Sequence, residues 1–74
     1  MANKTQEQIL AGLELEGPET ITNPFSGVSV ELDAQGVALY DYIKGCEMTG
    51  NKDFDQARYL FADLYPDAYM KLID

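Results

Sequence analysis

Hydrophobic residues change their spacing along the chain, and the first part of the chain has the spacing of a helix. Thr5 and Gln8 match the capping box that begins many helices. The apolar side chains that follow recur at helical intervals: Ile9, Leu10 and Leu13. Residues 1–16 are therefore predicted to form a short N-terminal helix that ends by Gly17. A helix this short is marginally stable by itself and depends on packing against the rest of the chain. We therefore expect it to be only loosely attached to the domain.

The next part of the chain has the two-residue period of a strand. Polar and apolar residues alternate strictly over residues 28–32, and three apolar side chains share one face: Val28, Val30 and Leu32. Residues 20–22 are a second strand-forming segment, and the five residues between the two segments are turn formers. The sequence therefore predicts a β-hairpin at about residues 20–32, with Pro24 confined to its turn.

Helical spacing returns after Asp33, a residue type that favours the N-cap of a helix. A helix is predicted over residues 34–48, and its apolar stripe is Leu39, Tyr40, Ile43 and Cys46. Gly45 lies one turn from Asp41 on this helix. Because glycine has no side chain, we expect a close helix contact at Gly45.

The last third of the chain predicts one further helix and the start of another. Asp53 is expected to cap a helix over residues 54–64, whose apolar stripe is Phe54, Ala57, Leu60, Phe61 and Leu64. Pro66 suits the first position of a fourth helix, whose apolar side carries Tyr69, Leu72 and Ile73. Together these elements predict one small α+β domain over residues 1–74, in which a hairpin packs with three or four short helices.

The charge of the chain limits its partners. The 74 residues include 13 Asp and Glu against 5 Lys and Arg, which gives a net charge of −8. Contacts with phosphate need Lys and Arg, so we expect no direct binding of nucleic acid and none of anionic membranes. A charged partner is expected to be basic. No apolar run is long enough to span a membrane, no signal peptide is evident, and a single thiol fits a reducing compartment, which together favour the cytoplasm.

The composition also excludes several kinds of chemistry. The chain has no histidine and one cysteine, Cys46, which rules out Cys and His zinc sites, Ser-His-Asp catalysis and an internal disulfide. Residues 51–55 resemble the start of a calcium loop, but Gln56 stands where that loop needs glycine. Cys46 falls on an apolar stripe and is predicted to be a buried small hydrophobe. We expect no enzymatic activity, no cofactor and no metal site.

Five tyrosines are too many for so small a core. Tyr42 and Tyr59 are expected to point outward, where exposed tyrosines often form protein interfaces. Together with the acidic Asp41 and Asp63 they are the candidate partner contacts. The alternative interpretation is that the tyrosines cover the edges of the core and leave their hydroxyls in water.

Three segments carry a resemblance to a known group of proteins. They are residues 22–27 (Thr-Asn-Pro-Phe-Ser-Gly), residues 38–45 (Ala-Leu-Tyr-Asp-Tyr-Ile-Lys-Gly) and residues 65–74, which begin Tyr-Pro-Asp-Ala-Tyr. In these segments the chain resembles small acidic proteins of unassigned function that are encoded by tailed bacteriophages. The resemblance implies a viral protein made in a bacterial cytoplasm, and it implies no activity or site residues.

These observations predict a non-enzymatic acidic protein that binds and modulates a basic host protein, one version of which is a nucleic-acid mimic. One alternative is a small structural or assembly protein of a virion or another complex. Another is an oligomer that sequesters a small anionic molecule, with Lys44, Arg58 and Lys71 as candidate anchors. Because the predicted helices are short, we expect self-association, with a two-fold dimer as the default.

Overall fold

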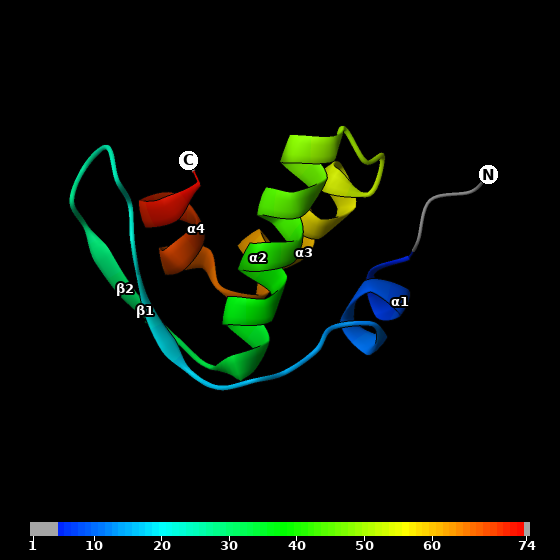
Figure 1. The fold of residues 1–74 in the computed structure, drawn as a ribbon, viewed down its shortest axis with the longest axis horizontal. Coiled ribbons are helices and arrows are strands. Elements are labelled where there is room, and N and C mark those ends of the chain that lie inside the picture. Colours follow the sequence, from blue (N-terminus) through cyan, green and yellow to red (C-terminus); the bar gives the residue numbers. More distant parts are fainter. Residues whose placement is uncertain (1–4, 74) are drawn as a thin grey trace.

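A computed structural model describes residues 5–73 and shows the predicted α+β arrangement of a two-stranded hairpin and helices (Figure 1). The elements are α1 (Gln6–Ala11), β1 (Glu19–Thr22), β2 (Ser29–Leu32), α2 (Ala34–Thr49), α3 (Phe54–Leu64) and α4 (Pro66–Leu72). The hairpin forms one end of the molecule in Figure 1, and α4 lies beside it. Helices α2 and α3 occupy the middle, and α1 lies at the opposite end.

The predicted hairpin is confirmed, with Pro24 in its turn. The strands are antiparallel, and their ladder pairs Glu19 with Leu32, Thr20 with Glu31, Ile21 with Val30, and Thr22 with Ser29. Leu32 is buried, and Ile21 and Val30 pack partly buried against the core. Val28 precedes β2 and is exposed, so the buried face of the second strand begins at Val30.

Helix α1 is shorter than predicted. Its capping box is present, because Thr5 N–H donates to Gln8 Oε1 at 2.9 Å and Gln8 N–H donates to Thr5 Oγ1 at 3.2 Å. The helix ends at Ala11 and not near Gly17, and residues 1–4 lie outside the described residues. Gly12 follows the last helical residue, and glycine costs about 1 kcal/mol relative to alanine inside a helix. The side chain of Ile9 is buried in the core and joins α1 to α3.

Helix α2 begins and ends close to the predicted residues. Asp33 is its N-cap, as predicted, and Asp33 Oδ1 accepts a hydrogen bond from Gly36 N–H at 2.8 Å. Gly50 ends the helix in the left-handed conformation, with φ of 71°, which glycine adopts without steric strain. The expected close contact at Gly45 is wrong, because a Cβ there would have no neighbour within 4 Å. The tight position is Gly36, where a Cβ would lie 3.2 Å from the side chain of Leu32.

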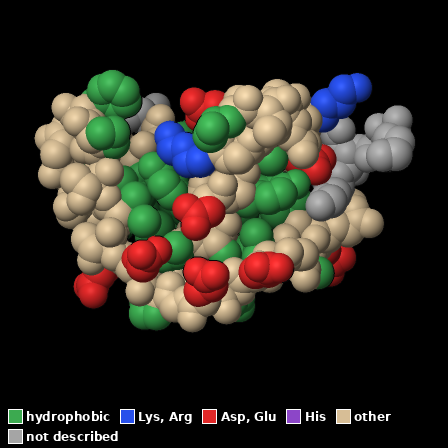
Figure 2. Space-filling model, viewed as in Figure 1, with side chains coloured by type: hydrophobic (Ala, Val, Ile, Leu, Met, Phe, Trp, Pro, Cys, Tyr) green, Lys and Arg blue, Asp and Glu red, His purple; other side chains and the backbone are tan. Residues whose placement is uncertain are grey.

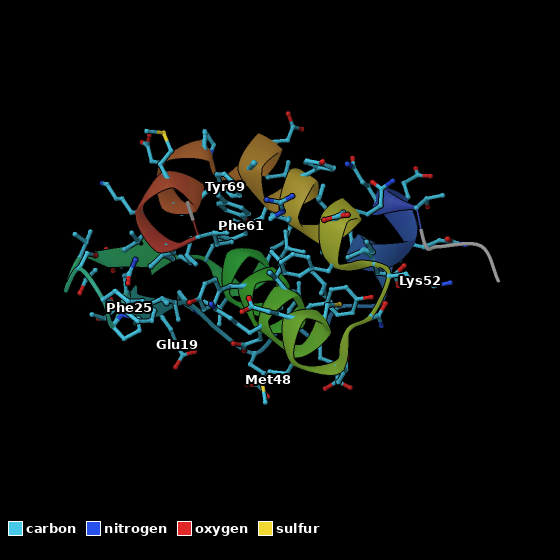
Figure 3. The ribbon with its side chains drawn as sticks, turned by 90° about the horizontal axis from the view of Figure 1, so that it is seen from above. Glu19, Phe25, Met48, Lys52, Phe61 and Tyr69 are labelled. Atoms are coloured by element: carbon cyan, nitrogen blue, oxygen red, sulfur yellow. The ribbon has the colours of Figure 1, made fainter. Side chains whose placement is uncertain are left out.

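The core is formed by α2, α3 and α4, together with Ile9 of α1 and Leu32 of β2. The largest fully buried side chains are Phe61, Leu39 and Ile43. The ring of Phe61 lies 5.4 Å from the ring of Tyr65 and 6.2 Å from that of Tyr40, measured between centroids. Figure 3 shows Phe61 among the helices, near Tyr69 of α4. The predicted stripe of α3 is confirmed in its centre, but Leu64 at its end is exposed.

Candidate functional site

A groove lies on the described surface between α2 and the segment of residues 12–16. Its volume is about 540 Å³, and it is open to solvent. The segment continues the chain after α1 without forming a helix or a strand. It runs past α2 on its way to β1, so the groove exists because α1 ends early at Ala11.

The floor of the groove is made by small and apolar residues of α2. Ala34, Ala38 and Gly45 line it, together with the buried Val37. Spacings of four and seven residues place the three small residues on one side of the helix. A partner side chain therefore meets a shallow apolar surface there, with Leu13 on the opposite wall.

The rim of the groove is acidic. Glu14 and Glu16 stand on one side and Asp41 on the other, and all three are exposed. None of them is paired with a base among residues 5–73, whereas Asp55 and Glu47 lie 3.5 and 4.0 Å from basic side chains elsewhere. Figure 2 shows acidic side chains along the lower edge of the face that carries α2, below hydrophobic side chains in its middle. The groove therefore combines an apolar floor with carboxylates that form no ion pair with a base among the described residues.

Tyr42 stands at the wall of the groove, but it does not point freely outward as expected. It is partly buried, and its hydroxyl donates a hydrogen bond to Asp53 Oδ2 at 3.0 Å. Burial raises the pKa of Tyr42 well above its usual range, and the bond to Asp53 raises the pKa further. The physical reason for the wrong prediction is that a buried carboxylate, only 7% exposed, needs a donor. Tyr42 therefore ties α2 to the start of α3.

Asp53 precedes α3 as predicted, but its side chain makes no capping hydrogen bond to that helix. Its carboxylate turns toward Tyr42 instead, and its backbone N–H donates to Asn51 Oδ1 at 2.8 Å. An Asn two residues before Asp53 is a turn signal that the sequence carries. The choice between capping α3 and accepting from Tyr42 depends on packing that the spacing of residues does not show.

The other two candidate contacts lie away from the groove. Tyr59 and Asp63 are four residues apart on α3 and both are exposed, Tyr59 by 58%, so Tyr59 points outward as predicted. The guanidinium of Arg58 lies 5.4 Å from the ring of Tyr59. The structure therefore separates the four candidates into Asp41 and Tyr42 at the groove and Tyr59 and Asp63 on α3.

The candidate metal ligands of the described residues are dispersed, and the one cysteine is buried. Within residues 5–73, no three His, Cys, Asp or Glu side chains gather closely enough to bind a metal ion. Cys46 is buried, as predicted, between the groove and a second, smaller hollow of about 340 Å³ at the loop before α3. No described helix is both long enough and apolar enough to cross a lipid bilayer.

Comparison with known proteins adds no relative, since no family model, curated protein or solved structure matches this chain. The candidate function is therefore argued from the groove and from the surface of the chain itself.

Proposed function

We propose that this chain is a non-enzymatic interaction protein that binds a basic segment of a host protein in the groove beside α2 and thereby modulates that protein. The observation that carries the proposal is the combination of an apolar floor and an acidic rim in one hollow. Neither an apolar floor nor an acidic rim alone indicates one class of partner. Together they fit a peptide segment whose side chains have both an aliphatic part and a positive charge.

Lysine and arginine fit such a groove better than other residues do. Their aliphatic stems can lie on Ala34 and Ala38 while their charged groups reach the carboxylates of the rim. Opposite charges across an interface also speed association and exclude acidic competitors. The net charge of −8 on the whole chain favours the same class of partner.

The setting of this function is also part of the proposal. The resemblance of residues 22–74 to small acidic phage proteins supports a phage-encoded protein that acts in the cytoplasm of a bacterial host. The single buried thiol of Cys46 is in keeping with a reducing compartment.

Reversing the charge of Asp41 tests the groove. A tagged chain is used to capture proteins from a bacterial lysate at low salt, and the captured protein is identified and purified. Asp41→Lys is expected to weaken its binding roughly ten-fold in calorimetry, because a base at the rim repels the basic segment. The difference should shrink at 1 M salt, where the screening length falls to about 3 Å.

Asp63→Lys is the matched control, because Asp63 is also an exposed helical aspartate and the substitution changes the net charge equally. It should bind nearly as well as the unmodified chain. Loss of binding with Asp63→Lys but not with Asp41→Lys would move the contact to the exposed face of α3. A lysate from which no protein is captured at low salt, or equal weakening by both variants, would count against a groove that binds a basic segment.

A further inference from the structure

The tip of the hairpin is held in one conformation by Asn23. Asn23 Oδ1 accepts hydrogen bonds from Phe25 N–H at 2.8 Å and from Ser26 N–H at 3.4 Å. The backbone of Asn23 closes the turn, since its C=O accepts from Gly27 N–H and its N–H donates to Val28 C=O, both at 2.8 Å. One asparagine thus fixes the path of residues 23–28.

The tip is restrained further by a contact with α4 and by two residues of the loop itself. Asn23 Nδ2 donates to the carbonyl of Lys71 at 2.9 Å, which ties the loop to α4. Pro24 restricts the backbone at the start of the turn, and Gly27 adopts a φ of 77°. A loop constrained in this way loses little conformational entropy when it binds a partner.

Phe25 is the large hydrophobic side chain that this ordered loop presents to solvent. It is 98% exposed, and Figure 3 shows it on the hairpin at the edge of the molecule. Its ring therefore gains no packing energy from the described chain. Buried aromatic side chains at the centre of an interface are frequent hot spots of binding energy.

The backbone around Phe25 offers hydrogen-bond acceptors and no free donor. Pro24 has no N–H, and the four N–H groups of residues 25–28 all donate within the loop. Among the described residues, no hydrogen bond reaches the carbonyls of Pro24, Phe25 or Ser26. A complementary surface must therefore place donors around the ring.

We propose that residues 23–28 form a preorganised aromatic anchor, whose Phe25 ring enters an apolar pocket on a partner protein that is rimmed by hydrogen-bond donors such as lysine, arginine or free backbone N–H groups. This inference rests on the proposed function for the existence of a protein partner, but it uses a surface that does not line the groove. A second copy of the chain fits poorly, because each copy carries a net charge of −8 and presents the same acceptors.

The test measures the affinity of the captured and purified partner for tip variants. Phe25→Ala is expected to weaken binding about 30-fold, the effect of removing a hot-spot side chain. Because the lost contact is apolar, this loss should persist at 1 M salt, unlike that of Asp41→Lys. Asn23→Ala should also weaken binding, because the loop must then be ordered during association.

Met48→Ala is the matched control, since Met48 is also a large exposed hydrophobic residue, 86% exposed, but belongs to α2 and not to the loop of residues 23–28. It should leave affinity unchanged. If Phe25→Ala binds the partner with unchanged affinity while Asp41→Lys binds more weakly, the proposed anchor is overturned and the proposed groove contact stands. If Phe25→Ala binds more weakly while Asp41→Lys binds with unchanged affinity, the anchor stands and the groove contact is overturned. A dimer in sedimentation experiments that Phe25→Ala dissociates would assign the tip to self-association and overturn the anchor as stated.

Discussion

Replacing Phe61 with alanine is expected to unfold most of the protein at 25 °C. Phe61 has no exposed surface and packs between the rings of Tyr40 and Tyr65. Truncating a buried phenylalanine costs about 3–5 kcal/mol, and a core of this size supplies only about 3–5 kcal/mol of net stability. Far-UV circular dichroism and urea titration should show a largely unfolded chain without a native baseline.

Tyr59→Ala on the same helix is the control, because it also truncates an aromatic ring, but one that is largely exposed. Its free energy of unfolding should stay within about 0.5 kcal/mol of the unmodified protein. A Phe61→Ala variant that unfolded cooperatively at the original urea midpoint would contradict the position of Phe61 at the centre of the core.

Asp33→Ala is expected to give the second large loss of stability, about 2 kcal/mol at pH 7. Asp33 Oδ1 caps α2 through Gly36 N–H and also accepts a hydrogen bond from the hydroxyl of Tyr65 at 2.7 Å. Removing an N-cap costs about 1 kcal/mol, and a side-chain hydrogen bond contributes about 1 kcal/mol more. Urea unfolding measures the sum, and Tyr65→Phe separates the second bond from the cap.

The loss caused by Asp33→Ala should depend on pH. The hydrogen bond from the Tyr65 hydroxyl lowers the pKa of Asp33 below its usual range, and the hydrogen bond from Gly36 N–H lowers that pKa further. A carboxyl group whose pKa is lower in the folded state stabilises the protein above the pKa of the unfolded chain, and this contribution disappears as pH falls through the folded pKa. The unfolding free energies of the variant and the unmodified protein should therefore converge at low pH. A difference that stayed constant from pH 7 to strongly acidic solution would contradict a role for the charged form of Asp33.

The elements that the sequence predicts well are those whose signals are local. Asp33 is followed by a helical stripe, and Pro66 begins the last helix, so both boundaries can be read from neighbouring residues. The spacing predicts the end of α1 too late, because Leu13 continues the helical pattern although the helix has ended before Gly12. After Gly12 the apolar and acidic residues alternate, which is a local sign that the helix has already ended.

The candidate site is harder to predict, since it depends on segments that are distant in the sequence. Asp41 can be found as an exposed acid, but its position opposite Glu14 and Glu16 follows from the path of residues 12–16 across α2. Tyr42 is partly buried because Asp53, eleven residues away, accepts its hydroxyl hydrogen. The sequence predicts Phe25 only as part of a turn, and the Asn-Pro pair before it is the signal that this turn is rigid.

The hydrogen bond between Asn23 and Lys71 has a consequence for biosynthesis. It joins residues 48 positions apart, so the hairpin leaves the ribosome well before the helix that holds its tip. Until α4 has formed, the tip lacks the hydrogen bond to Lys71. During that time Phe25 belongs to a two-stranded hairpin that is only marginally stable by itself. Nascent chains should therefore compete poorly with finished molecules for the same partner, and binding capacity should appear late, with the docking of the last helix.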